Sequence, residues 1–349
     1  MYDVSTIQVL SFPEAVRRRP GMYLGGTDAT ARHHLLWEVV GNAVDEHLAG
    51  HASYVRVTIA GDAIAVDDDG RGIPAEAIEV VLTRMHAGSG FRRDHVHLAR
   101  SQRGVGIAPV NALCEALTAE VWRDGRWVRQ RFARGVPLGP VEDLGPADRT
   151  GTRIMLVPDR TIFAPAAWNR LAVARRLREL AALVPITTIL DHDAFRCPDG
   201  LADHARYLAR GELAPLRVRG QRDGIAVEAA VGWTADDRAR VRGFVGCAPA
   251  SRGTHLDGLA DGLAAAIASA APARLAGVHR AALREVLERG LVACVHVMFA
   301  DPRFGEPTRE RLVNPEVRAA VAAVVGDGIA AQLAADRTLA GCLLARLPG

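Results

Sequence analysis

The sequence predicts an α+β protein of two domains. Its 349 residues suffice for two domains of ordinary size, and 49% of them are hydrophobic, so the chain can bury a sizeable core. Segments that alternate like strands are interleaved with segments that have helical periodicity. Near residue 212 one such series ends, and a second begins after Pro215. We therefore expect a domain boundary there.

The first half starts with an arm that contains prolines and glycines, and a long helix follows. Two alternating strands flank Gly61-Asp62, which predicts a β-hairpin. Further helices and strands alternate after the hairpin. The expected helices are residues 30–49, 75–85 and 105–117, and the expected strands are 54–60, 63–66, 117–122, 127–133 and 152–157.

The second half has a new set of strands, an alanine-rich helical stretch at 263–271 and a final helix. That helix begins at Pro315, a residue favoured in the first turn, and carries valines on one stripe. This spacing predicts an amphipathic helix packed on a sheet. The expected strands are 224–233, 241–245 and 291–299.

Composition indicates a cytoplasmic protein without membrane contact. No N-terminal stretch looks like a signal peptide, and no apolar run approaches the roughly 18 residues that span a bilayer. The five cysteines are scattered and never spaced as CxxC. We therefore expect reduced thiols and no structural metal.

The net charge is +3, and the sequence contains no lysine. A P-loop of the GxxxxGK[ST] kind is therefore excluded, and any phosphate contact must come from arginine or backbone. The small positive charge permits nucleic-acid contact without indicating it. Arginine clusters at 17–19 and 217–222 fit either a solvated surface or a DNA footprint.

A narrow polar stripe runs along the first long helix. Its members recur every three to four residues: His34, Glu38, Asn42 and then Asp45 or Glu46. A surface helix would also show such a stripe. Because apolar residues flank this one on both sides, we expect its carboxylates and amide to line a pocket.

A second polar feature ends the hairpin, where the chain reads DDDGRGIP. Asp68 is in strand phase with Ile64 and Val66, so it falls on the face that should be buried. A buried carboxylate needs a dedicated donor. Asp68 either caps the following turn through backbone N–H groups or accepts from the exocyclic amine of a ligand.

A third feature is Gly104-Val105-Gly106 at the start of an expected helix. Glycines at this place let backbone N–H groups approach a phosphate, and the helix N-terminus favours negative charge. Alone, such a pair of glycines is a weak signal, since most are plain turns.

In this order and spacing the three features resemble the GHKL ATPases, above all the B subunits of DNA gyrase and topoisomerase IV. The resemblance runs from residue 1 to about residue 345. Segments 19–25, 37–46 and 68–74 are similar to the family's RPGMYIG, E-x-x-x-N and DDGRGIP motifs. Further matches are His86-Ala87-Gly88, Thr150-Gly151-Thr152 and Gly253-Thr254-His255.

The resemblance implies a GHKL (Bergerat) sandwich of a mixed sheet and helices, followed by a transducer domain like domain 2 of ribosomal protein S5. The implied domains are a dimerisation arm at 1–18, the ATPase domain at 19–212 and the transducer at 213–349. The implied cofactors are ATP and Mg²⁺. The arm, with Tyr2 and Ile7 at the matching positions, would join a homodimer when ATP binds, and DNA or other topoisomerase subunits are further implied partners.

Carried over position by position, the family implies that Glu38 is the general base and that His34 orients it. Asn42 would hold Mg²⁺, and Asp68 would accept from the adenine amino group. The other implied nucleotide contacts are Asp45, Glu46, Gly72, Ile73, Pro74, Thr152, Val39, Val66 and Ile154, with Arg71 and Arg129 at the pocket mouth and Gly104, Val105, Gly106 and Arg309 at the phosphates.

Two departures from the family bear on turnover. The glycine-rich lid reads RSQRGVG over residues 100–106, so Arg100 or Arg103 either adds a phosphate contact or obstructs closure. The lysine that reaches the γ-phosphate in the family is matched by Arg309, and Pro307 replaces a glutamine. Arginine keeps the charge but has a different geometry.

The metal-binding TOPRIM signature that follows in gyrase B does not occur here, so we expect no DNA cleavage by this chain alone. One hypothesis is an ATP-driven clamp of a topoisomerase, as a stand-alone protein or a fragment. A second is a GHKL fold reassigned to an ATP-dependent small-molecule biosynthetic or regulatory role. A third is a module that binds nucleotide without turnover.

Overall fold

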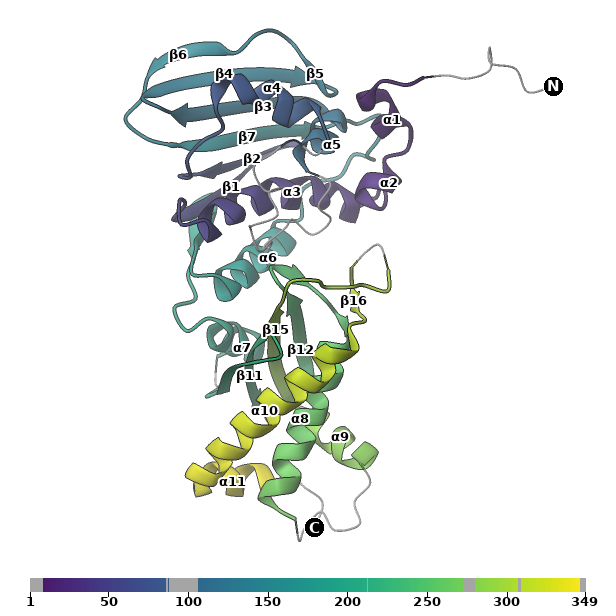
Figure 1. Cartoon of the computed structure of the whole chain (residues 1–349), viewed down its shortest axis with the longest axis vertical. Helices are drawn as coiled ribbons and strands as arrows, with labels where there is room; N and C mark the ends of the chain where they lie inside the picture. Colours follow the sequence, from purple (N-terminus) through teal and green to yellow (C-terminus); the bar gives the residue numbers. More distant parts are fainter. Residues whose placement is uncertain are drawn as a thin grey trace, which may run out of the picture. The chain divides into compact units, whose positions relative to one another are not determined.

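A computed structural model of the chain describes residues 9–85, 87, 106–211, 213–272, 280–306 and 309–345. The chain divides into two compact units (Figure 1). Unit 1 comprises Met1–Leu177 and Ile186–Arg196, and unit 2 comprises Arg178–Pro185 and Cys197–Gly349. The functional boundaries at 18 and 212 stay predictions.

Unit 1 contains a mixed nine-stranded sheet with the order β5-β4-β3-β7-β2-β1-β8-β9, in which β6 pairs with β4. The β1–β8 pair is parallel, whereas the other pairs are antiparallel. The strands are β1 (Tyr54–Ala60), β2 (Ala63–Asp68), β3 (Cys114–Arg123), β4 (Arg126–Ala133), β5 (Val136–Pro137), β6 (Glu142–Pro146), β7 (Gly151–Pro158), β8 (Thr187–Leu190) and β9 (Asp193–Phe195).

The long helix α3 (Ala29–Leu48) packs on β1 and β2, as Figure 1 shows. It begins where the Asp28 carboxylate accepts from the Ala31 N–H at 2.7 Å, which satisfies a free donor of the first turn. The hairpin and this helix confirm the sequence prediction. The other helices are α1 (Phe12–Arg18), α2 (Gly21–Leu24), η2 (Ala75–Ala77), α4 (Ile78–Thr83), α5 (Ile107–Ala112) and α6 (Arg170–Leu183), which continues into unit 2.

Two expected helices were too long. The predicted helix 75–85 is a 3₁₀ turn followed by α4, which ends at Thr83. The predicted helix 105–117 ends at Ala112, because the chain from Cys114 onward pairs with β7 as strand β3. Pairing in the sheet outweighs the helix propensity of the leucine, glutamate and alanine in this stretch.

Strand register divides the unit 1 sheet into a buried face and an open face. On the buried face, Val55, Asp68, Thr152 and Val121 form one row across β1, β2, β7 and β3. The row one residue away lies on the open face and alternates in charge, as opposite charges on neighbouring strands attract. Its members are Arg56, Asp67, Arg153, Glu120, Arg129 and Glu142.

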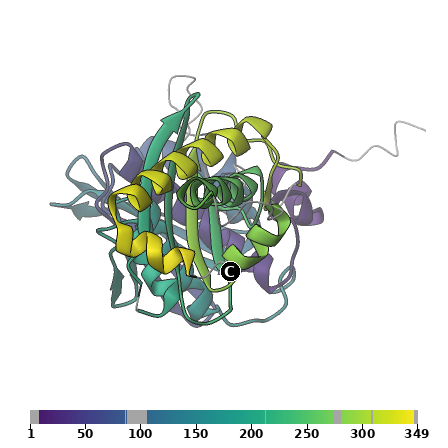
Figure 2. The same cartoon turned by 90° about the horizontal axis from the view of Figure 1, so that it is seen from below.

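Unit 2 contains a five-stranded sheet with the order β10-β11-β15-β12-β13. The helices α8 (Thr254–Ala270) and α10 (Pro315–Ala335) lie side by side on one face, and α7 (Leu201–Ala209) covers the other (Figures 1 and 2). The remaining elements are β10 (Leu216–Arg222), β11 (Ile225–Trp233), β12 (Arg240–Val245), β13 (Ala248–Pro249), β14 (Arg252–Gly253), α9 (Arg280–Glu288), β15 (Leu291–Met298), β16 (Arg311–Leu312) and α11 (Arg337–Leu344).

Close packing of α8 on α10 depends on glycine. A Cβ atom on Gly258 would lie 2.6 Å from the Arg318 carbonyl oxygen. Among the described helices, α10 alone is long and apolar enough to cross a membrane by length and composition. Its Val317, Val321 and Val325 are buried against α8 and the sheet, which is the position of a core helix.

Candidate active site

The polar stripe of α3 changes from buried to exposed along the helix. Glu38 has only 2% of its surface exposed, whereas Asn42, one turn later, is exposed. His34, one turn earlier, hydrogen-bonds through Nδ1 to the Leu24 carbonyl at 3.0 Å. Because a carbonyl only accepts, Nδ1 carries the proton, which leaves Nε2 as an acceptor in the neutral ring. The helix thus holds a buried carboxylate between an oriented imidazole and an accessible amide.

Asp68 ends β2 on the buried face and is 7% exposed. Its Oδ1 accepts from the Gly70 N–H at 2.9 Å. Burial raises the pKa of this carboxyl to about 7, and repulsion from Glu46 and Asp67 adds to the rise, which the backbone hydrogen bonds only partly offset. A buried carboxylate with so few donors favours a ligand that brings one.

The floor beneath Asp68 is apolar. Val66 precedes Asp68 by two residues on the same face and pairs with Ile154, as Asp68 pairs with Thr152. Val66 and Ile154 are both buried. Strand register therefore brings together four of the residues predicted to surround an adenine, while Gly72, Ile73 and Pro74 follow in the adjoining turn.

The turn after Asp68 requires glycine at two positions. A Cβ atom on Gly70 would lie 2.9 Å from Asp68 Oδ1 and 3.0 Å from Glu46 Cγ. Gly72 has φ 76°, and a Cβ atom there would lie 2.7 Å from the Trp122 carbonyl oxygen. The turn is pressed between α3 and the end of β3, which accounts for both glycines of the motif.

Arg71 is held by Glu46 of α3. Its Nη2 donates to Oε1 at 2.8 Å, and its Nε and backbone N–H donate to Oε2 at 3.1 Å. Burial opposes the ionisation of Glu46, but these bonds outweigh it and lower its pKa. Glu46 thus fixes the turn through Arg71, while the neighbouring Asp45 is exposed.

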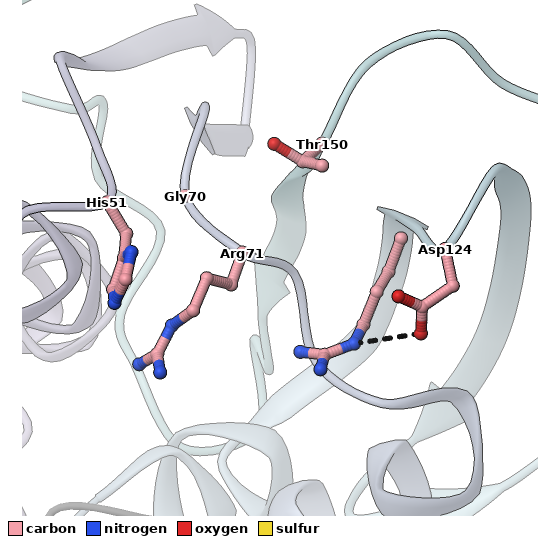
Figure 3. A pocket seen from close by; sticks show the side chains of 6 residues that line it. His51, Gly70, Arg71, Asp124 and Thr150 are labelled. Carbon is pink, nitrogen blue, oxygen red and sulfur yellow. Dashed lines mark hydrogen bonds and ion pairs between the residues drawn. The ribbon is translucent and has the colours of Figure 1, made fainter.

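A cavity of about 300 Å³ opens beside this turn. Figure 3 shows His51 and Arg71 on its one side and Asp124 on the other. Arg123 donates from Nη1 to the Gly72 carbonyl at 2.8 Å and from Nε to Asp124 at 3.2 Å. The complete lining is His51, Gly70, Arg71, Arg123, Asp124 and Thr150.

His51 and Arg123 are site residues that the sequence alone did not reveal. Arg123 precedes the Asp124-Gly125 turn, and pairing of β3 with β7 brings that turn to the end of β2. Only the order of strands in the sheet reveals this neighbourhood. His51 lies in the loop shortly after the end of α3, where no sequence pattern marks it as a site residue.

Arg129 is not brought to this group. It lies on the open face and pairs with Glu142 at 2.8 Å, whereas Asp68 lies on the buried face. Its predicted place at the pocket mouth therefore has no support from strand register, and Arg123 lines the described cavity instead.

Several predicted residues have no described relation to the Asp68 group. Arg309 belongs to unit 2, where it has φ 58° and its N–H donates to the Glu306 carbonyl at 3.0 Å. Gly106, with φ 78°, is the cap residue of α5. The other predicted positions, Tyr2, Ile7, His86, Gly88, Arg100, Arg103, Gly104, Val105, Pro307 and Thr308, lie outside the described residues.

The oxygen ligands that α3 offers suit a magnesium ion that is bound together with nucleotide phosphates. Within the described ranges, no group of three or more His, Cys, Asp or Glu side chains could hold a metal ion. Asn42 offers an exposed amide oxygen one turn from Glu38. Mg²⁺ is usually held by one or two protein oxygens together with substrate phosphates and water, and Asn42 fits that arrangement.

A polar helix over the buried face of a mixed sheet, with an aspartate at the end of the neighbouring hairpin, defines a nucleotide-binding sandwich of the GHKL class. Residues 27–162 match the family of histidine kinase-, DNA gyrase B-, and HSP90-like ATPases, and residues 200–347 match DNA gyrase B. These two matches confirm the predicted ATPase fold and are consistent with a transducer domain after it.

Within the GHKL class, the chain is most usefully compared with individual gyrase B proteins. The chain is 36% identical to the DNA gyrase B protein of Chlamydia pneumoniae over 94% of its own length and 45% of that protein. It is 35% identical to the gyrase B protein of Archaeoglobus fulgidus, of which it covers 55%. The chain thus spans about half the length of the curated relatives it matches.

Solved structures cover nearly the whole chain. The 43K ATPase domain of Thermus thermophilus gyrase B, in complex with an aminocoumarin, is 31% identical, with a TM-score of 0.76 over 97% of this chain and 94% of that one. The gyrase B protein of Myxococcus xanthus is 27% identical, with a TM-score of 0.82 over 96% of this chain and 99% of that one. The chain therefore belongs to the gyrase B family and corresponds to its ATPase region.

Proposed function

We propose that unit 1 binds ATP and hydrolyses it, as a cytoplasmic enzyme of the gyrase B type. The observation that carries the proposal is Asp68, a nearly buried carboxylate with a raised pKa above the apolar floor of Val66 and Ile154. An adenine amino group would supply the missing donor, and the planar base would cover the floor. Family membership supports this hypothesis over a small-molecule biosynthetic role.

In the proposed reaction, Glu38 accepts a proton from the water that attacks the γ-phosphate. His34, held by the Leu24 carbonyl, would orient the base. Mg²⁺ bound with the nucleotide would neutralise phosphate charge, and Asn42 would hold it. Arg309 would add a cation to the γ-phosphate, and the backbone at Gly104, Val105 and Gly106 would bind the phosphates.

The proposed ATPase acts as a clamp. The domains are the arm at 1–18, the ATPase domain at 19–212 and the transducer at 213–349, and ATP binding joins two copies through Tyr2 and Ile7 of the arm. By analogy with the gyrase proteins it resembles, the chain would act on DNA together with topoisomerase partners. Turnover that rises on addition of duplex DNA would support that role, whereas turnover that requires a metabolite would contradict it.

The test of the site separates binding from chemistry. Glu38→Ala should retain nucleotide affinity and lose hydrolysis, because the base contacts water rather than adenine. Asp68→Asn should weaken binding itself. Single-turnover ATP hydrolysis and calorimetric titration with ADP measure the two effects. Equal loss of binding and hydrolysis in Glu38→Ala would contradict this division of roles.

A further inference from the structure

An ionic cluster around a buried carboxylate joins the base of the N-terminal arm to the core of unit 1. Asp159, directly after β7, has a side chain that is 1% exposed. Its Oδ2 accepts from Arg17 Nη2 at 2.8 Å and from Arg134 Nε at 2.9 Å. Its Oδ1 accepts from the Thr161 N–H at 2.8 Å and from the Thr161 hydroxyl at 2.7 Å. Four donors therefore surround one carboxylate.

Arg17 connects this cluster to α5. Besides Asp159, it donates from Nη1 to the carbonyl of Ala112, the last residue of α5, at 3.0 Å. The last carbonyls of a helix have no partner within the helix, so an arginine at this end is a specific cap. Close packing supports the contact: a Cβ atom on Gly135 would lie 3.0 Å from Ala112 Cα and 3.1 Å from Pro13 Cβ of α1.

The helix α5 is a short, fully buried connection. All its residues are buried, and Asn111 donates to the Leu82 carbonyl of α4 at 2.9 Å. Its first residue follows Gly106, the end of the predicted phosphate-binding segment, and its last carbonyl is bound by Arg17. With 1.5 Å per residue, the two ends lie roughly 9 Å apart. Because packed elements do not deform continuously, a shift at one end must move the other.

We propose that Arg17 is a positioning residue that couples nucleotide binding to dimerisation, by fastening α1, the base of the arm, to α5. The proposal rests on the proposed function, in which residues 1–18 join two copies when ATP binds. In this arrangement nucleotide at the N-terminal end of α5 fixes the helix, and Arg17 carries that constraint to the arm. The contacts of Arg17 are to Ala112, Asp159 and Thr161, none of which belongs to the proposed nucleotide site.

The test compares Arg17→Gln with Arg19→Gln, an exposed arginine just after α1 that gives the same change of charge. Sedimentation velocity with a non-hydrolysable ATP analogue measures dimerisation. ADP titration at a protein concentration where the chain is monomeric measures binding alone. We expect Arg17→Gln to dimerise about tenfold more weakly, as typical couplings between sites require, with ADP affinity unchanged within about twofold. Arg19→Gln should behave as the unmodified chain does.

A structural role alone would give a different pattern. If Arg17→Gln lost ADP affinity in step with dimerisation, or dimerised normally, the coupling would be refuted. Arg17→Lys keeps the charge but lacks the fork that binds Asp159 and Ala112 together, so it should restore dimerisation only in part. Full restoration by lysine would show that charge alone suffices and would contradict the geometric coupling. If the unmodified chain fails to bind ADP, the proposed function itself is wrong.

Discussion

Unit 1 contains two buried aspartates whose pKa values are shifted in opposite directions, and the difference distinguishes a ligand-binding carboxylate from a structural one. Asp68 is 7% exposed and has a pKa near 7, because burial and like charges outweigh its few backbone donors. Asp159 is 1% exposed, yet its pKa lies well below the usual range. Burial opposes ionisation there as well, but hydrogen bonds from Thr161, Arg17 and Arg134 outweigh it.

Burial alone therefore does not mark a functional carboxylate. What distinguishes Asp68 is a deficit of donors, which a ligand can supply. The neighbouring aspartates illustrate the point within three residues. Asp67 accepts from the Tyr54 hydroxyl at 2.7 Å, and Asp69 accepts from the Ser53 N–H at 2.7 Å, so both are satisfied by the protein.

The largest expected effect on stability comes from replacing Asp159, whose carboxylate finds its hydrogen-bond donors within the protein. Asp159→Asn removes the charge that Arg17 and Arg134 bind, and it leaves Arg17 partly buried without its carboxylate. Breaking a fully buried ion pair by removing one partner costs about 3–5 kcal/mol, and the partial exposure of Arg17 and Arg134 places the expected loss toward the lower end of that range. Urea denaturation should show a loss of this order. A loss below about 1 kcal/mol, the range of surface pairs, would refute the structural role.

Asp68→Asn, unlike Asp159→Asn, should not destabilise the fold. Asp68→Asn removes a carboxyl that burial and two like charges disfavour, and the amide oxygen can still accept from Gly70. At pH 8 the free energy of unfolding should stay within about 1 kcal/mol of the original or rise, as for polar groups whose partners remain satisfied. Paired denaturation curves of the two variants check this, and a large destabilisation by Asp68→Asn would remove the contrast.

Nucleotide affinity should depend on pH through Asp68. The ionised carboxylate accepts more strongly from an amino group than the neutral carboxyl does, so nucleotide that binds below pH 7 favours release of a proton. A carboxyl with a pKa of about 7 then predicts affinity that falls as pH drops below 7, by up to about tenfold per pH unit, and levels off above it. ADP titration from pH 5.5 to 8.5 measures the slope. The slope should vanish in Asp68→Asn, and a slope that persists there would assign it to another group.

Because folding is linked to protonation of Asp68, the stability of the nucleotide-free protein depends on pH in the opposite direction to nucleotide affinity. The pKa of Asp68 is raised from 3.8 in the unfolded chain to about 7 in the fold. The folded state therefore binds more protons between these values, and this carboxyl lowers stability as pH rises through the range. Asp159, whose pKa is depressed, contributes stability above its unfolded value and loses it in acid.

Sequence patterns revealed the buried carboxylates of the site but not their surroundings. The strand phase of Asp68 and the spacing of Glu38 and Asn42 follow from local periodicity, which a sequence displays directly. The places of Arg123 and of the cluster around Asp159 depend on which strands and turns are neighbours in the sheet. Arg129 was assigned to the pocket by its position relative to the motif, but strand register places it on the open face. Such non-local pairings leave no local pattern.

The smallest effect should come from Glu46, which both restrains the site and repels Asp68. Glu46→Gln weakens the fork to Arg71, a partly exposed pair, so ADP affinity at pH 8 should fall only about two- to fivefold. It also removes a charge that raises the pKa of Asp68, so the midpoint of the pH dependence should move below 7. ADP titration across pH measures both changes, with Glu115→Gln, at an exposed glutamate of β3, as the control. A midpoint that stays in place would show that desolvation alone sets the pKa of Asp68, and a midpoint that rises would contradict the electrostatic account of the site.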